Sequence, residues 1–70
     1  MLVSDLGKQI KERRDTLGIT QPDLAEMAGV NINTIYNIES GRGNPTIKKL
    51  SKILEILGME LTLTVKKPEL

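Results

Sequence analysis

Apolar positions repeat every three or four residues in four successive stretches of the chain, which predicts four helices. The first covers residues 4–17, where charged side chains fill the positions between Leu6, Ile10 and Leu17. Gly18 ends it, because glycine readily takes the left-handed conformation that closes a helix. An apolar face and a charged face together indicate an amphipathic helix that packs against a core.

Two short helices follow, separated by a single glycine turn. Residues 21–28 come directly after Thr20, whose hydroxyl can cap a helix. Gly29 then supplies the turn, and Asn31 can cap a third helix that ends near Ser40. The sequence therefore predicts two short helices joined by a tight turn.

A fourth helix follows a dense turn signal of glycine, asparagine and proline at residues 41–45. Either Asn44 or Thr46 can cap this helix, and Gly58 ends it. Its inner side is predicted to carry Ile47, Leu50, Ile53, Leu54 and Leu57.

After Gly58 the period changes from that of a helix to that of a strand. Residues 59–65 alternate apolar and polar side chains. The apolar members are Met59, Leu61, Leu63 and Val65. A lone strand leaves its backbone groups unpaired, so we expect a second copy to complete an antiparallel ribbon in a two-fold dimer. The alternative is pairing within the chain with Leu2 and Val3, which make a very short strand.

The composition limits which kinds of functional site this chain can form. Its 70 residues have room for one small core. It contains no cysteine and no histidine, which excludes disulfides, Cys/His zinc sites, thiolate nucleophiles and imidazole bases. We therefore expect no enzymatic activity, no cofactor and no metal. Tyr36 is the only aromatic residue, which argues against binding single strands by base stacking. Without a leader or a long apolar segment, we expect a cytoplasmic protein that does not enter membranes.

The two short helices and their glycine turn predict a helix-turn-helix, in which the second helix enters the DNA major groove. Ala25 is small enough to let the two helices approach closely, and Gly29 supplies the turn. Ile35 and Ile38 anchor the recognition helix in the core. A four-helix interaction module would share this hydrophobic pattern and is the alternative.

Several motifs resemble the Xre, or lambda-repressor-like, helix-turn-helix family. They are LGITQPDLA at residues 17–25, AGV at 28–30, Ile35, IESGR at 38–42 and NP at 44–45. The resemblance covers about residues 6–58, and the terminal strand is similar to that of small HipB-type antitoxins, whose C-terminal strands pair across the dimer. It implies an all-α bundle of four to five helices plus one C-terminal β-strand. Residues 1–58 would form the DNA-binding domain, and residues 59–70 the dimerisation strand and tail.

Side chains that read bases are expected on the face of the third helix that points away from the core. Ile32, Asn33, Tyr36 and Asn37 lie there. Asparagine can bond bidentately to adenine, and isoleucine can touch a thymine methyl group. The resemblance adds Gln21 and Asn31 at DNA-facing positions. We predict base contacts from Gln21, Ile32, Asn33 and Asn37. The alternatives are that Gln21 bonds only phosphate, Asn31 serves mainly as a helix cap, and Asn37 is merely solvated.

Phosphate contacts are expected from another part of the chain, because no lysine or arginine lies between Thr20 and Gly41. Four basic residues in the following loop and fourth helix, Arg42, Lys48, Lys49 and Lys52, form a stretch without acids, and helix N-termini attract phosphate oxygens. We predict phosphate contacts from Asn31, Tyr36, Arg42, Thr46, Lys48 and Lys49. For Lys49 and Lys52 a simply solvated basic face is the alternative.

The resemblance also implies a salt bridge between Arg14 in the first helix and Glu39 at the end of the third. Glu39 is then a structural residue rather than a catalytic acid, and a partly buried bridge orients the two helices. The alternative is a surface charge at Glu39.

These observations predict a dimeric regulator, expected to be a repressor, that binds double-stranded DNA at a palindromic operator. Its half-sites would lie about ten base pairs apart. A second hypothesis is an antitoxin that neutralises a toxin, such as a HipA-like kinase, and represses its own operon. A third is a controller of a restriction-modification operon, and nothing in the chain separates this from the first.

Overall fold

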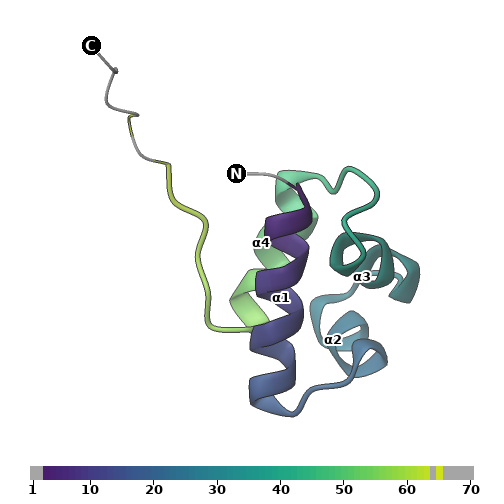
Figure 1. The fold of residues 1–70 in the computed structure, drawn as a ribbon. Helices are drawn as coiled ribbons and strands as arrows, with labels where there is room; N and C mark the ends of the chain where they lie inside the picture. Colours follow the sequence, from purple (N-terminus) through teal and green to yellow (C-terminus); the bar gives the residue numbers. More distant parts are fainter. Residues whose placement is uncertain (1–2, 64, 66–70) are drawn as a thin grey trace.

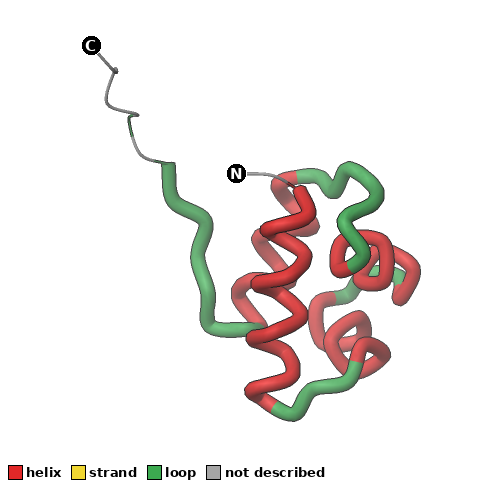
Figure 2. Tube along the Cα trace, viewed as in Figure 1, coloured by secondary structure: helices red, strands yellow, loops and turns green. Residues whose placement is uncertain are grey.

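The computed structural model describes residues 3–63 and residue 65, and this part of the chain contains four helices (Figure 1). They are α1 (Val3–Leu17), α2 (Gln21–Ala28), α3 (Ile32–Glu39) and α4 (Ile47–Ile56). Short loops join them, and the chain leaves the bundle after α4 (Figure 2). The predicted helical fold is confirmed.

All four helices end with the same glycine motif. The glycine that follows each helix has a positive φ of 68° to 77°. The next residue then donates its N–H to a carbonyl five residues earlier, as Ile19 does to Arg14 at 3.1 Å. The four glycines are Gly18, Gly29, Gly41 and Gly58. This motif fixes the direction in which the chain leaves each helix.

Polar side chains cap the starts of α2, α3 and α4. The caps are Thr20, Asn31 and Thr46, and each accepts a hydrogen bond from a backbone N–H in the first turn at 2.8 to 3.2 Å. Thr46 therefore caps α4, rather than the other candidate, Asn44.

One hydrophobic core joins the four helices, with α3 contacting α1 and α2, and α2 contacting α4. Its buried members are Ile10, Leu24, Ala25, Ala28, Ile35, Ile38, Leu50, Ile53, Leu54 and Leu57. Two predicted core positions are wrong, because Leu17 is 42% exposed and Ile47 is 66% exposed. Leu17 is the last residue of α1 and Ile47 is the first of α4. Both continue the apolar pattern of their helix, but they lie beyond the part of the helix that its neighbours cover.

The backbones of α1 and α3 lie unusually close together at Gly7. A Cβ atom at this buried position would overlap the carbonyl oxygen of Ile38. It would also lie 2.9 Å from the carbonyl carbon of Ile38 and 3.1 Å from Cα of Glu39. Glycine is therefore required here by the distance between two helices, and not by its own backbone conformation.

A side-chain hydrogen bond joins α1 to the end of α4. Arg13 donates from Nε to the carbonyl oxygen of Leu57 at 2.9 Å. A cation at a helix C-terminus also complements the negative end of the helix dipole. This contact closes the bundle where the C-terminal segment begins.

The segment after Gly58 first packs on the core through the half-buried Met59 and then runs away from the bundle (Figure 1). Residues 59–63 and 65 have no regular secondary structure, so the predicted strand is not formed within the single chain. A strand requires a neighbouring strand to satisfy its backbone groups. The alternative, in which this strand pairs with Leu2 and Val3, is wrong for Val3, because Val3 begins α1. Leu2, residue 64 and residues 66–70 lie outside the described residues.

Within the described residues, no helix is both long enough and apolar enough to cross a membrane.

Candidate nucleic-acid interface

The helix-turn-helix consists of α2, the turn at Gly29 and α3. Val30 donates its N–H to the carbonyl oxygen of Ala25 at 3.0 Å, which closes α2 and directs the chain into α3. Ala25 is buried, and α2 and α3 are in contact. The two helices therefore form one unit with a fixed angle.

The eight-residue helix α3 has one buried face and one exposed face. Ile35 and Ile38 are almost completely buried. The exposed face carries Ile32, Asn33, Tyr36 and Asn37, and it is uncharged. Ile32 is 44% exposed and Tyr36 is 52% exposed, so two large apolar surfaces alternate with two amides that can donate and accept hydrogen bonds. This mixture matches the edges of base pairs in a major groove.

Asn31 serves as the N-cap of α3. Its Oδ1 accepts a hydrogen bond from the backbone N–H of Asn33 at 2.8 Å. The oxygen of Asn31 is therefore used for capping, as the alternative hypothesis expected. Its amide N–H groups are still able to donate to a phosphate.

A hollow of about 150 Å³ lies between α3 and the start of α4. It brings together four of the predicted DNA-contacting residues from α3, the connecting loop and α4. They are Asn37, Arg42, Thr46 and Lys49. Two cations, an amide and a helix N-terminus in one concave place are suited to a phosphate oxygen.

The exposed positive charges of the following loop and of α4 lie outside the exposed face of α3. Arg42, Lys48 and Lys49 are all exposed, and Lys48 lies on α4 outside this hollow. The last residue of α3, Glu39, carries the only charge of that helix. The exposed amides of α3 and the exposed cations of the loop and α4 thus lie on different elements.

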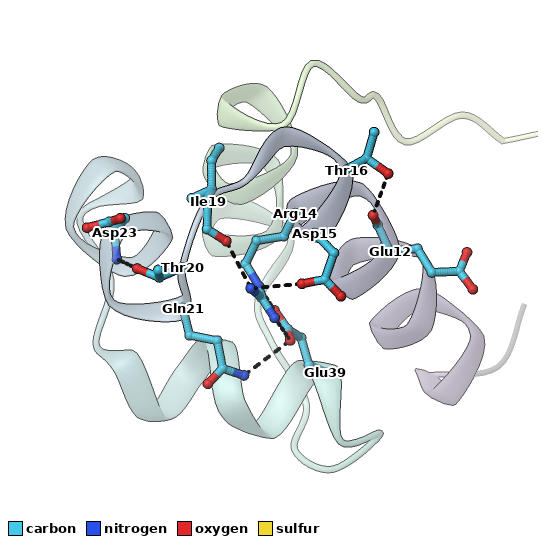
Figure 3. Close-up of polar contacts among 9 residues, drawn as sticks. All are labelled: Glu12, Arg14, Asp15, Thr16, Ile19, Thr20, Gln21, Asp23 and Glu39. Carbon is cyan, nitrogen blue, oxygen red and sulfur yellow. Dashed lines mark hydrogen bonds and ion pairs between the residues drawn. The ribbon is translucent and has the colours of Figure 1, made fainter.

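A buried ion pair joins the ends of α1 and α3 (Figure 3). Arg14 donates from Nε to Oε2 of Glu39 at 2.8 Å and from Nη2 to Oε1 at 2.9 Å. Its Nη1 donates to the carbonyl oxygen of Ile19 at 2.9 Å and also lies 3.3 Å from the exposed carboxylate of Asp15. The side chains of Arg14 and Glu39 are only 10% and 3% exposed. Hydrogen bonding to Glu39 raises the pKa of Arg14, although burial opposes this shift.

Gln21 lies beside this ion pair and not on the outer face of α3. Its Nε2 donates to Oε1 of Glu39 at 3.1 Å (Figure 3). The side chain is half-buried, so part of the amide is open to solvent. One of its hydrogen bonds is therefore used within the protein.

Two further candidates for DNA contact, Lys11 and Ser40, were not predicted from the sequence. Lys11 and Ser40 line a hollow of about 150 Å³ together with Gln21, Tyr36 and Glu39. Lys11 precedes Arg14 by three residues, so it lies on the same side of α1. That spacing, together with the expected bridge between Arg14 and Glu39, was the available signal for Lys11.

No group of three or more metal-ligating side chains occurs in the part of the chain that the structure describes.

Comparison with known proteins shows the same architecture. Residues 10–63 match the family model described as helix-turn-helix. An uncharacterized HTH-type transcriptional regulator from Methanothermobacter thermautotrophicus is 43% identical over 51 residues, covering 73% of this chain and 74% of that protein. The HTH-type transcriptional regulator PuuR from Escherichia coli is 33% identical over 63 residues, covering 90% of this chain.

Several relatives are much longer than this chain. It spans 34% of PuuR and 17% of a relative from Methanocaldococcus jannaschii.

Among solved structures, a chain of the HipA-HipB-O2-O3 complex has a TM-score of 0.82 and 33% identity, covering 96% of this chain and 94% of that chain. The family match and the fold agree with the geometry of α2 and α3. The chain therefore belongs to the Xre-like helix-turn-helix family, and several of its relatives are named HTH-type transcriptional regulators.

Proposed function

We propose that the protein is a sequence-specific repressor that binds double-stranded DNA as a dimer, with one α3 helix in the major groove of each half-site. The exposed face of α3 carries this proposal, because the amides of Asn33 and Asn37 stand beside the exposed Ile32 on a helix whose other face is buried. Asn33 and Asn37 would bond to base edges, and Ile32 would contact a thymine methyl group. A dimer that covers an operator excludes other proteins from it, which favours repression.

Backbone contacts would hold α3 in this position. Arg42, Thr46 and Lys49 surround the hollow at the start of α4, and Lys48 extends the positive surface along that helix. Asn31 would donate to a phosphate through its free amide N–H groups, and Tyr36 through its hydroxyl group. Few cations face each half-site, so binding by two subunits at once is needed for useful affinity.

The C-terminal segment would supply the dimer contact. Leu63 and Val65 are 95% and 96% exposed, and Met59 and Leu61 line a groove of about 300 Å³ against α4. Two such segments paired antiparallel would satisfy each other's backbone groups and cover these apolar side chains. The likeness to a chain of the HipA-HipB-O2-O3 complex along 96% of this chain supports this arrangement.

Selection from a random duplex pool tests the proposal. The 70-residue chain is mixed with the pool at moderate salt, and the bound fraction is sequenced. An enriched inverted repeat with half-sites about ten base pairs apart is the expected result. Enrichment of single half-sites would contradict the dimer, and no enrichment would contradict sequence-specific binding.

Two substitutions then test the division between base and phosphate contacts. Asn33→Ala should relax the preference at one position of each half-site and cost roughly 1 to 3 kcal/mol of discrimination. Lys48→Ala should weaken binding to all sequences alike and reduce the slope of log affinity against log salt by about one. Equal changes of selectivity in both variants would contradict this division.

A second candidate function is that of an antitoxin. The structure of the HipA-HipB-O2-O3 complex contains a chain similar to this one, which favours a HipA-like toxin as a second partner. The antitoxin would then neutralise that toxin and repress its own operon. Purification of the tagged protein from its native cells distinguishes the two functions, because an antitoxin should bring a stoichiometric toxin with it and a simple repressor should not.

A further inference from the structure

The carboxylate of Glu39 is shared by two other helices. Its Oε1 accepts hydrogen bonds both from Nη2 of Arg14 at 2.9 Å and from Nε2 of Gln21 at 3.1 Å (Figure 3). The three residues occupy the last turn of α1, the first position of α2 and the last position of α3. One buried oxygen atom therefore fixes the position of a half-exposed amide at the beginning of the helix-turn-helix.

Arg14 leaves this carboxylate little freedom to move. The guanidinium holds both oxygens of Glu39 and also binds the carbonyl of Ile19, two residues before Gln21. A planar guanidinium that is hydrogen-bonded both to a carboxylate and to a backbone carbonyl is rigid. The acceptor offered to Gln21 thus has a fixed position, and the charge of Arg14 neutralises a carboxylate that would otherwise repel DNA phosphates.

The amide of Gln21 has hydrogen-bonding capacity beyond this contact. A glutamine side chain has two N–H donors and one acceptor oxygen, and Glu39 uses one donor. The amide borders the hollow lined by Lys11, Tyr36 and Ser40, next to the exposed face of α3. An unrestrained glutamine would lose rotamer freedom on binding DNA, whereas one already held loses less.

We propose that Glu39, held by Arg14, is a positioning residue that orients the amide of Gln21 for a hydrogen bond to DNA beside the recognition helix. This inference rests on the proposed function, because it requires that Gln21 contact DNA. Glu39 does not itself touch DNA, since its side chain is only 3% exposed. This part of its effect on affinity passes through Gln21 and disappears when the amide is removed.

A double-mutant cycle in DNA affinity tests this proposal. Gln21→Ala, Glu39→Gln and the double variant are titrated with the selected operator at a temperature where circular dichroism shows that all are folded. Gln21→Ala should weaken binding by about tenfold in the parent chain, which corresponds to the loss of one hydrogen bond. In the E39Q background the same substitution should cost clearly less than in the parent chain, because the neutral side chain keeps only one acceptor oxygen, which Arg14 and Gln21 must compete for.

Lys48→Ala is the matched control, because Lys48 lies on α4 and shares no hydrogen bond with the Glu39 cluster. It should cost the same factor in the parent and E39Q backgrounds. If Gln21→Ala also costs the same factor in both, Glu39 has a structural role only and the proposal is wrong. If Glu39→Gln does not fold, the same cycle is measured with Glu39→Asp, which keeps the charge but shortens the side chain. That cycle then decides whether Glu39 positions Gln21 or has a structural role only.

The outcomes separate this proposal from the proposed function. If the parent protein binds the operator but Gln21→Ala is without effect, the positioning role is refuted while DNA recognition stands. If the parent protein binds no DNA selectively, both are refuted. When the positioning role holds, an equal loss on all sequences assigns the Gln21 contact to a phosphate, and a loss restricted to one base position assigns it to a base edge.

Discussion

The close approach of α1 and α3 at Gly7 predicts that a single methyl group will destabilise the fold. In Gly7→Ala the new Cβ would overlap the carbonyl oxygen of Ile38 and lie 2.9 Å from its carbonyl carbon, whereas ordinary van der Waals contact begins at 3.4 Å. The obstructing atoms belong to the backbone, so no side-chain rotation relieves the overlap. The two helices must separate, which also strains the hydrogen bonds between Arg14 and Glu39.

The expected magnitude combines two opposing effects. Replacing glycine by alanine inside an unobstructed helix would stabilise it by about 1 kcal/mol. Overpacking typically costs about 1 to 3 kcal/mol, and a backbone obstruction lies at or above the upper end. We therefore expect a net loss of roughly 2 kcal/mol or more for Gly7→Ala. The total stability of a chain of this size is roughly 4 to 10 kcal/mol.

Thermal unfolding followed by far-ultraviolet circular dichroism measures this loss. For a domain of this size 1 kcal/mol corresponds to about 4 to 8 °C, so Tm should fall by at least about 8 °C. Lys8→Ala, at the neighbouring exposed position of α1, is the control and should change stability by less than about 0.5 kcal/mol. A Gly7→Ala protein that melts at or above the parent temperature would refute the close crossing of α1 and α3.

Two further predictions concern the ion pair and the C-terminal segment. Glu39→Ala should lower the free energy of unfolding by roughly 3 to 5 kcal/mol, because it leaves the buried guanidinium of Arg14 without its partner. An unchanged melting temperature would mean that the bridge contributes no more than an exposed pair. Leu63→Lys combined with Val65→Lys should convert a dimer to a monomer in analytical ultracentrifugation without loss of helical signal, whereas Thr62→Lys should remain dimeric. A double variant that still sediments as a stable dimer would contradict the ribbon.

Local signals in the sequence were sufficient to predict the helices and their ends. Gly18, Gly29 and Gly58 follow helices as predicted and have a positive φ, and the caps Thr20 and Asn31 act at short range. Such signals involve only residues within one turn of each other. Leu17 and Ile47 were misassigned because periodicity shows which face is apolar but not where the neighbouring helix stops.

Contacts between helices were harder to predict. Gly7 had no local role in a helix, and its importance depends on the position of Ile38, which is distant in the sequence. The hydrogen bond from Gln21 to Glu39 likewise requires the relative positions of α2 and α3. The resemblance to a known family supplied the Arg14–Glu39 pair, but not its third member. The predicted strand of residues 59–65 would need a partner edge, and the described residues of one chain do not provide one.

One face of α1 sets the position of the helix that would read DNA. Helix α3 has only eight residues, which is too short to be stable alone, so its orientation comes from its neighbours. Gly7, Ile10 and Arg14 lie on one side of α1, at intervals of three and four residues. Gly7 meets the backbone of Ile38, Ile10 is buried in the core, and Arg14 binds Glu39. Both the separation of the helices and the rotation of α3 are thus fixed from α1. Substitutions on this face should therefore alter base preference as well as stability, although none of its three residues lies on the reading face.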